Sequence, residues 1–73
     1  MALVESLKAG QLPSPSLRRA IRLSAGVSLR EVGEELGVTA MTILRWERGD
    51  ADPRRDRAIA YRLLLDALQD AAS

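Results

Sequence analysis

The chain has 73 residues, of which 29% are charged, and its formal net charge is +1. A chain of this length makes one small domain, which buries only about 60% of its unfolded surface. It has no cysteine and no histidine, which excludes disulfides, thiolate metal sites, and the commonest general base and metal ligand.

Residues 1–13 are expected to form an arm that precedes the folded domain, which we place at residues 14–73. Residues 2–8 have the apolar spacing of a short helix, and Gly10 ends it. The Q-L-P-S-P-S run that follows is extended, because each proline disfavours the helical conformation of the residue before it. No signal peptide or membrane span is apparent, so we expect a cytoplasmic protein, associated with the nucleoid or, if phage-encoded, located in the host cytoplasm.

The first helix of the domain is predicted over residues 15–24. Ser14 can cap it, and Pro15 occupies the first helical position, where a missing amide hydrogen costs nothing. Gly26 is a suitable stop. One face of this helix carries Leu17, Ala20, Ile21 and Ser24.

Two short amphipathic helices follow, joined by a turn at Gly37. Ser28 and Glu31 form a capping box before the first, and Thr39 is placed to cap the second, which covers residues 40–48. Two helices joined at a steep angle by such a turn form the helix-turn-helix motif, whose second helix enters the major groove of DNA. The predicted inward-facing residues are Leu29, Val32, Gly33 and Leu36 in the first helix, and Ile43 and Trp46 in the second.

The last helix is predicted to open at Asp52 and Pro53, with Asp52 as its cap, and to run to about Gln69, roughly 24 Å at 1.5 Å per residue. Its apolar arc is wider than a surface helix of a monomer needs. We therefore expect a homodimer contact on this helix, and in the alternative the apolar residues of the arm cover the same surface. The candidates for the dimer interface are Leu64, Leu65 and Leu68, and those of the arm are Leu3, Val4 and Leu7.

The chain resembles the phage repressor and Cro-like (Xre) family of helix-turn-helix proteins over about residues 16–68. The resemblance rests on G-V-S-L-R-E-V-G-E-E-L-G-V-T, on M-T-I-L-R-W-E-R-G, and on Arg22. The opening L-P-S-P and the final Y-R-L-L-L-D-A-L are similar to small actinobacterial and phage-encoded members. The family implies an all-α, compact, four- to five-helix lambda-repressor-like domain. This chain departs from it at Leu29, where glutamine is usual, and at Gly33, where alanine is usual.

The resemblance also implies which residues meet DNA. Base-reading positions fall on the outward side of the 40–48 helix, where Arg45 can bind guanine O6 and N7 and its apolar neighbours can contact a thymine methyl. For Met41 and Leu44 the alternative is packing against a partner protein. The implied base-reading residues are Ala40, Met41, Leu44 and Arg45, and the phosphate-binding residues are Ser28, Thr39, Thr42, Arg48, Arg54 and Arg55.

Nearly all basic residues are arginines, which bind phosphates and guanine edges through two parallel hydrogen bonds. They gather in two groups, and each group is either a phosphate footprint or ordinary helix-surface charge. Arg22 and Glu47 resemble the family's internal ion pair and are expected to be structural. The first group is Arg18, Arg19, Arg22 and Arg30, and the second is Arg45, Arg48, Arg54, Arg55, Arg57 and Arg62.

These features predict a sequence-specific transcriptional regulator, a repressor, which binds double-stranded DNA as a homodimer at an approximately palindromic operator. The alternative is a helix-turn-helix module that binds mainly protein, such as an antitoxin, a recombination accessory factor or a polymerase-binding factor. It is favoured by the balanced charge, by the apolar side chains of the reading helix, and by Asp50 and Asp52 in the loop that follows. An enzyme is not indicated, and no cofactor or metal is expected, because the chain lacks the residues that such sites need.

Overall fold

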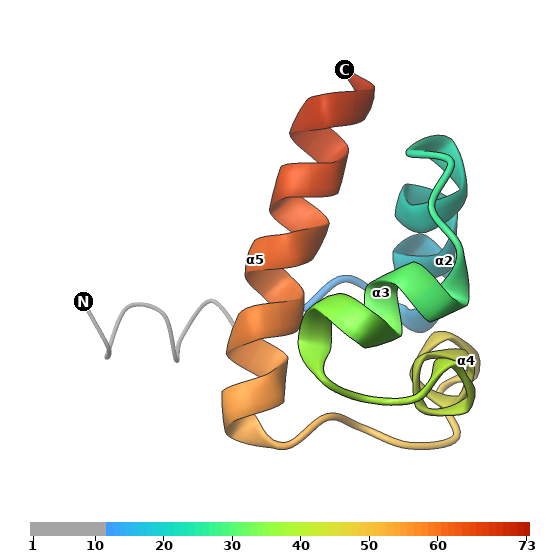
Figure 1. The fold of residues 1–73 in the computed structure, drawn as a ribbon, viewed down its shortest axis with the longest axis vertical. Coiled ribbons are helices and arrows are strands. Elements are labelled where there is room, and N and C mark those ends of the chain that lie inside the picture. Colours follow the sequence, from blue (N-terminus) through green and yellow to red (C-terminus); the bar gives the residue numbers. More distant parts are fainter. Residues whose placement is uncertain (1–11) are drawn as a thin grey trace.

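The computed structural model describes residues 12–73, which form four α-helices and no strand (Figure 1). The all-α fold class predicted from the sequence is therefore confirmed. The short helix predicted at residues 2–8 lies outside the described residues. In chain order the helices are α2 (Pro15–Ser24), α3 (Leu29–Leu36), α4 (Ala40–Arg48) and α5 (Arg55–Ala72).

The first three of these helices begin where the sequence predicts. The Ser14 hydroxyl accepts a hydrogen bond from the amide of Leu17 at the start of α2. At α3 the capping box is complete: the amide of Glu31 donates to Ser28 Oγ and the amide of Ser28 donates to Glu31 Oε1, both at 3.0 Å. The bond from the Ser28 backbone lowers the pKa of Glu31 below its ordinary value. Thr39 caps α4 by accepting from the amide of the residue three positions later, at 3.2 Å.

The predicted start of the last helix is wrong. Helix α5 begins at Arg55, with Arg54 at the cap position in an extended conformation and without a side-chain capping bond, and it continues to Ala72. Asp52 and Pro53 belong to the loop from α4, which runs along one end of the molecule to reach the foot of α5 (Figure 1). Residues 52–54 are not helical, so the local Asp-Pro signal does not set the boundary.

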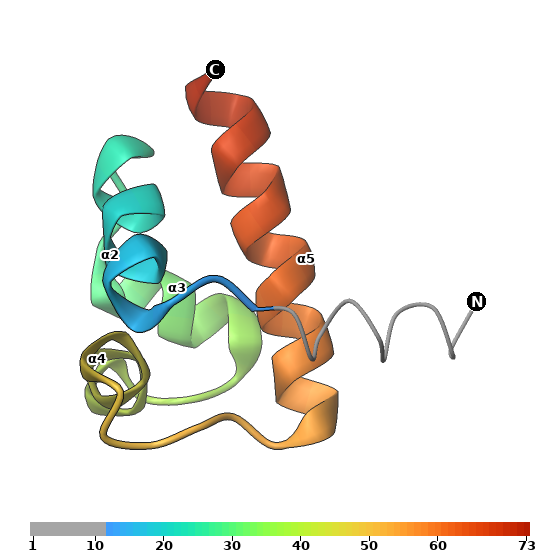
Figure 2. The same cartoon turned by 180° about the vertical axis from the view of Figure 1, so that it is seen from behind.

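The core lies between α5 and the layer formed by α2, α3 and α4 (Figure 2). Three large side chains at its centre, Ile43, Tyr61 and Leu65, are at most 2% exposed. This corrects one predicted dimer residue: Leu65 packs inside its own chain and has no surface to offer a partner. The buried cluster consists of Ile21, Val32, Leu36, Ile43, Trp46, Tyr61 and Leu65.

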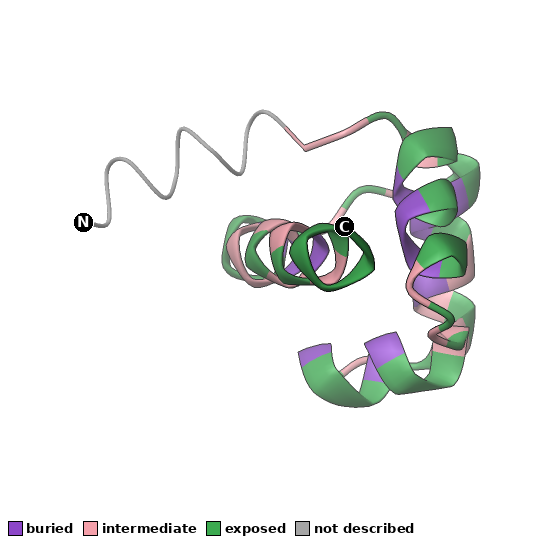
Figure 3. Cartoon of the chain, turned by 90° about the horizontal axis from the view of Figure 1, so that it is seen from above, coloured by how far each residue is buried: buried purple, intermediate pink, exposed green. Residues whose placement is uncertain are grey.

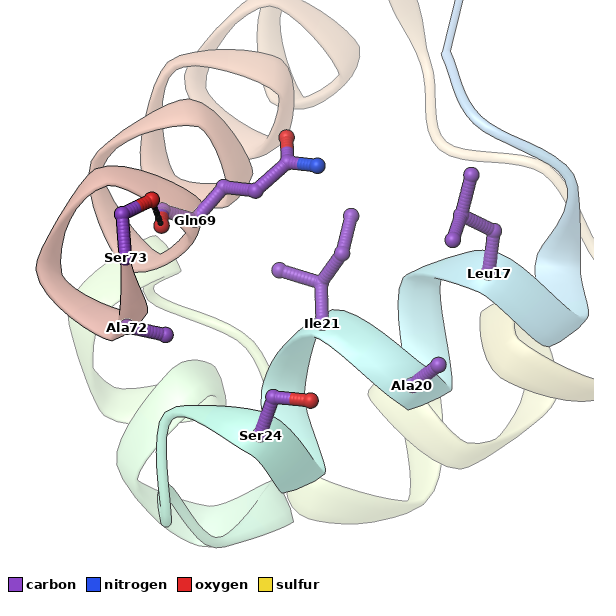
Figure 4. A pocket seen from close by; sticks show the side chains of 7 residues that line it. All are labelled: Leu17, Ala20, Ile21, Ser24, Gln69, Ala72 and Ser73. Carbon is purple, nitrogen blue, oxygen red and sulfur yellow. Dashed lines mark hydrogen bonds between the residues drawn. The ribbon is translucent and has the colours of Figure 1, made fainter.

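Helix α2 turns a different side toward the core than its apolar spacing suggests. Of the residues on its predicted apolar face, only Ile21 is buried, and it is flanked there by Arg18 and Arg22. The rest of that face lines an open groove of about 310 Å³ between α2 and the last turns of α5 (Figure 4). The residues that line this groove are Leu17, Ala20, Ile21, Ser24, Gln69, Ala72 and Ser73.

The turn between α3 and α4 explains why glycine is found at position 33. A Cβ built on Gly33 would lie 2.6 Å from the carbonyl oxygen of Val38, which is far inside normal contact distance. The amide of Val38 also donates to the carbonyl of Gly33 at 2.8 Å. Gly37 ends α3 in the left-handed conformation, with φ of 71°, which favours glycine. Two glycines thus allow α3 and α4 to approach closely.

No helix among residues 12–73 is both long and apolar enough to cross a lipid bilayer.

Candidate nucleic-acid interface

Helix α4 presents one line of exposed side chains on the side opposite the core. Ile43 and Trp46 point inward, at 0% and 4% exposure, whereas Met41 is 55% exposed. Arg45 and Arg48 are also exposed. The spacing of Met41, Arg45 and Arg48, by four and then three residues, places them on one face of the helix.

The remaining predicted base-reading residues lie at the border of this face. Ala40 and Leu44 are half-buried, between the exposed line and the buried side of α4. Arg48, which the sequence assigned to phosphate, shares the exposed face with Met41 and Arg45. In the sequence, the spacing of residues 41, 45 and 48 is the signal that would have placed these three side chains on one face of the helix. The exposed line therefore contains two arginines and one thioether side chain.

The hydroxyl residues predicted at phosphate all have a local role. The hydroxyls of Thr39 and Thr42 lie 3.0 Å apart and share a hydrogen bond at the start of α4. Ser28 accepts its capping bond from Glu31. Thr39 and Ser28 are exposed, and Thr42 is half-buried. A hydroxyl can donate one bond while it accepts another, so these caps do not prevent phosphate contact.

Two further arginines lie where the loop after α4 meets the start of α5. Arg54 and Arg55 are exposed at the foot of α5, at the same end of the molecule as α4 (Figure 1). Asp50 and Asp52 are exposed in the same loop. The loop thus brings both signs of charge to this end of the domain, which limits the positive potential that the arginines can create.

Arg22 and Glu47 form a bidentate ion pair that joins α2 to the end of α4. Nε and Nη2 of Arg22 donate to the two carboxylate oxygens of Glu47 at 2.6 and 3.0 Å. The side chains are only 10% and 1% exposed. Nη1 of Arg22 donates to the carbonyl of Val27 at 3.0 Å, so the same guanidinium also binds the turn that follows α2. The hydrogen bond to Glu47 raises the pKa of Arg22, which favours the charged guanidinium.

Arg18 has a structural position that the sequence analysis missed. It is 7% exposed, so it is not part of a phosphate footprint. Nε donates to the carbonyl of Pro13 at 2.7 Å, and Nη1 donates to the carbonyl of Trp46 at 3.2 Å. The guanidinium also lies 6.0 Å from the centre of the Tyr61 ring. The spacing of Arg18 to Arg22, one turn apart beside Ile21, was the only sequence signal for this position.

An aromatic contact joins Trp46 of α4 to Tyr61 of α5. The rings of Trp46 and Tyr61 are 5.2 Å apart, and both side chains are buried. Burial raises the pKa of Tyr61 to about 12. Its hydroxyl has no hydrogen-bond partner among residues 12–73. The last turns of α4 are therefore held by two arginines of α2 and by an aromatic contact with α5.

Comparison with known proteins agrees with this geometry. The helix-turn-helix family model HTH_3 matches residues 19–66, which contain all of α3, the turn and α4. No curated protein and no solved structure matches the chain. The matched family is one of DNA-binding domains and is not a family of enzymes.

Proposed function

Because this chain belongs to the helix-turn-helix family HTH_3, we propose that it is a sequence-specific repressor of transcription. In this proposal it binds double-stranded DNA as a homodimer, and α4 of each copy lies in the major groove. The major groove accepts an α-helix, and its base edges distinguish all four base pairs. The observation that carries the proposal is the exposed line of Met41, Arg45 and Arg48 on a helix whose other side is fixed in the core.

The side chains on this face favour one kind of half-site. Arg45 can donate two parallel hydrogen bonds to O6 and N7 of a guanine, and Met41 can contact the methyl group of a neighbouring thymine. Ala40 and Leu44 add apolar contacts from the edge of the face. We therefore propose a half-site that contains a guanine next to thymines.

Phosphate contacts set the register of α4 on the duplex. Arg48, Arg54 and Arg55 are our candidates, with the hydroxyls of Ser28, Thr39 and Thr42 around them. Three arginine contacts from each of two copies would give a slope of log K against log salt of about −5. The acidic residues of the loop lower the electrostatic part of the affinity, which operator and random DNA share.

The proposed homodimer predicts the symmetry of the operator. Two copies related by a two-fold axis would present their α4 helices to half-sites about 10 base pairs apart, centre to centre, and the operator would be an approximate palindrome. Occupancy of a promoter is enough to block transcription, which is why we propose repression. A protein with this function works where the DNA is, at the nucleoid.

Selection of duplexes from a random library tests the proposal. The selected sequences should share a palindromic motif, and anisotropy titrations at about 50 and 200 mM salt should show affinity for it that falls by roughly 10³-fold. A module that binds mainly protein, which the 55% exposure of Met41 would also suit, would select no motif and show a flat salt dependence.

Arg45→Ala tests the reading role of α4. It should cost about 1–3 kcal/mol on the selected duplex and change binding to random DNA little. Arg30→Ala is the matched control, because Arg30 is an exposed arginine on α3 that pairs with Glu34 at 3.0 Å. An equal loss on selected and random DNA would mean that Arg45 contacts phosphate only.

A further inference from the structure

The groove between α2 and the last turns of α5, which we call the α2/α5 groove, is apolar and is left open by residues 12–73. It holds about 310 Å³, and its lining residues include no charged side chain. Ile21 points between the two helices (Figure 4), and Leu17 beside it is 47% exposed. An uncovered apolar groove on so small a domain indicates a contact surface.

The chain that leads into α2 lies at one end of this groove. Leu12 packs against the buried core, and the carbonyl of Pro13 accepts a hydrogen bond from Arg18 Nε at 2.7 Å. The next residue, Ser14, accepts a hydrogen bond from the amide of Leu17, which lines the groove. In Figure 3, which looks along α5, this segment passes α5 on the side opposite to α3. The residues before Leu12 therefore join the folded domain beside the α2/α5 groove.

We propose that the α2/α5 groove binds residues 2–8 of the same chain, as a short amphipathic helix. Leu3, Val4 and Leu7 share one face of such a helix, and Glu5 lies on the opposite face. The apolar face suits a groove without charged lining residues, because no charged group has to lose its water when the two surfaces meet. This contact is independent of DNA binding and therefore goes beyond the proposed function.

The lengths of helix and groove agree. Residues 2–8 are about 10 Å long as a helix, at 1.5 Å per residue, and the wall that α2 contributes from Leu17 to Ser24 has about the same length. Residues 9–11 can extend over roughly 10 Å, and Gly10 among them allows the chain to reverse its direction. The helix can therefore lie along the groove without a change in the described part of the chain.

The second apolar groove of the domain suits residues 2–8 less well. It lies between α3 and α5, and its lining includes the carboxylate of Glu35, which would have to lose water beside apolar side chains. It is also lined from α3, whereas Leu12 leaves the domain on the other side of α5 (Figure 1 and Figure 2). Charge and position both favour the α2/α5 groove.

The covalent link favours this occupant over a second copy of the chain. A short flexible linker holds a segment near its binding site at an effective concentration in the millimolar range, roughly. A second copy at micromolar concentration would have to bind the same small groove much more tightly to compete. Because Pro13 is already held by Arg18, only the residues before Leu12 have to become ordered.

Two exposed leucines of α2 provide a matched test. Leu17 lines the groove and is 47% exposed, whereas Leu23 does not line it and is 51% exposed. If residues 2–8 cover the groove, Leu17→Ser in the full chain should lower Tm by about 10 °C, because a buried apolar contact is lost. Leu23→Ser should lower Tm by less than about 4 °C, as a surface substitution does.

A double-mutant cycle connects this effect to the segment before Leu12. Leu7→Ser should lower Tm about as much as Leu17→Ser, because each change removes one side of the same contact. The two changes together should lower Tm clearly less than the sum of the single effects, because contacting residues are not additive. Leu7→Ser combined with Leu23→Ser should be additive, because these two side chains do not meet.

Paired cysteines locate the segment directly. The chain has no cysteine, so an introduced pair can form only one disulfide. Leu7→Cys with Ala20→Cys, at the α2/α5 groove, should cross-link within one chain in a glutathione buffer. Its effective concentration should be at least about tenfold above that of Leu7→Cys with Leu63→Cys. Leu63 is the matched target, because it is exposed and lines the second groove.

Three results would overturn the proposal. They are a Tm of Leu17→Ser no lower than that of Leu23→Ser, additive effects of Leu7→Ser and Leu17→Ser, and equal effective concentrations at Ala20 and Leu63. A disulfide that joins two chains, seen as a dimer on a non-reducing gel, would also overturn it, because the groove would then hold this segment of a second copy.

Discussion

The buried pair of Arg22 and Glu47 should be essential for the stability of the domain. Glu47→Ala removes a carboxylate that is 1% exposed and accepts two hydrogen bonds from Arg22. The guanidinium would keep its bond to Val27 but would lose its counter-charge. Water cannot easily replace the carboxylate, because Arg22 is only 8% exposed.

The expected loss is large for a chain of this size. Removal of one partner of a buried pair costs about 3–5 kcal/mol, since the other charge is left uncompensated. At about 0.05–0.15 kcal/mol per residue, a domain of this length has a free energy of unfolding of roughly 4–11 kcal/mol. One kcal/mol changes Tm by about 4–8 °C in such domains. Glu47→Ala should therefore lower Tm by at least about 12 °C, and it unfolds the chain if the native stability is at the low end.

Thermal and urea unfolding, followed by circular dichroism, measure this loss. Glu34→Ala is the control on the same chain, because it breaks the exposed pair of Arg30 and Glu34, whose side chains are 85% and 66% exposed. It should cost less than about 0.5 kcal/mol. Replacement of both buried partners, Arg22→Met with Glu47→Leu, should recover most of the loss, because no charge remains unpaired. The reasoning is refuted if Glu47→Ala costs no more than Glu34→Ala.

Three further changes have defined outcomes. Gly33→Ala should destabilise the domain by about 1–2 kcal/mol despite its better helix propensity, because its Cβ would meet the Val38 carbonyl at 2.6 Å; a neutral or stabilising result in urea unfolding would contradict this. The pKa of Tyr61 is raised to about 12, so the folded state holds this proton more tightly than the unfolded chain, and its contribution is complete below pH 10 and is lost toward pH 12. Alkaline unfolding should show a loss of about 2 kcal/mol over that interval, and Tyr61→Phe should remove the pH dependence. Arg54→Ala should weaken binding to selected and random DNA alike and reduce the salt slope by about one per protomer, whereas an unchanged slope would exclude a phosphate contact.

Most helix boundaries could be predicted because their signals are complete within a few residues. The capping box of Ser28 and Glu31, and the glycines at positions 37 and 49, each satisfy backbone groups of the helix that they border. The start of α5 could not be predicted in this way. Asp52 and Pro53 form a valid local signal, but the path of the loop across the end of the molecule overrides it.

Side-chain positions that depend on tertiary contacts were less accessible. In the sequence, Arg18 has the character of a surface residue of an amphipathic helix. Only its contacts with Pro13 and Trp46 in the structure show why it is buried. Leu65 could not be separated from Leu64 without the phase of α5 relative to the core. In contrast, the pairing of Arg22 with Glu47 was expected from the family resemblance, because both residues occur in its motif.

The anchoring of α4 at one end has a consequence for the entropy of binding. Arg18 holds the carbonyl of Trp46, and Arg22 holds Glu47, so the last turn of α4 is immobilised when the chain folds. The conformational freedom of this turn is therefore lost during folding and need not be lost again when a ligand is bound. The first turn of α4 is positioned as well, because the backbone of Thr39 and Ala40 lies close to Gly33 of α3. Both ends of α4 are therefore fixed by the fold, and little conformational entropy should remain to be lost along the helix when DNA is bound.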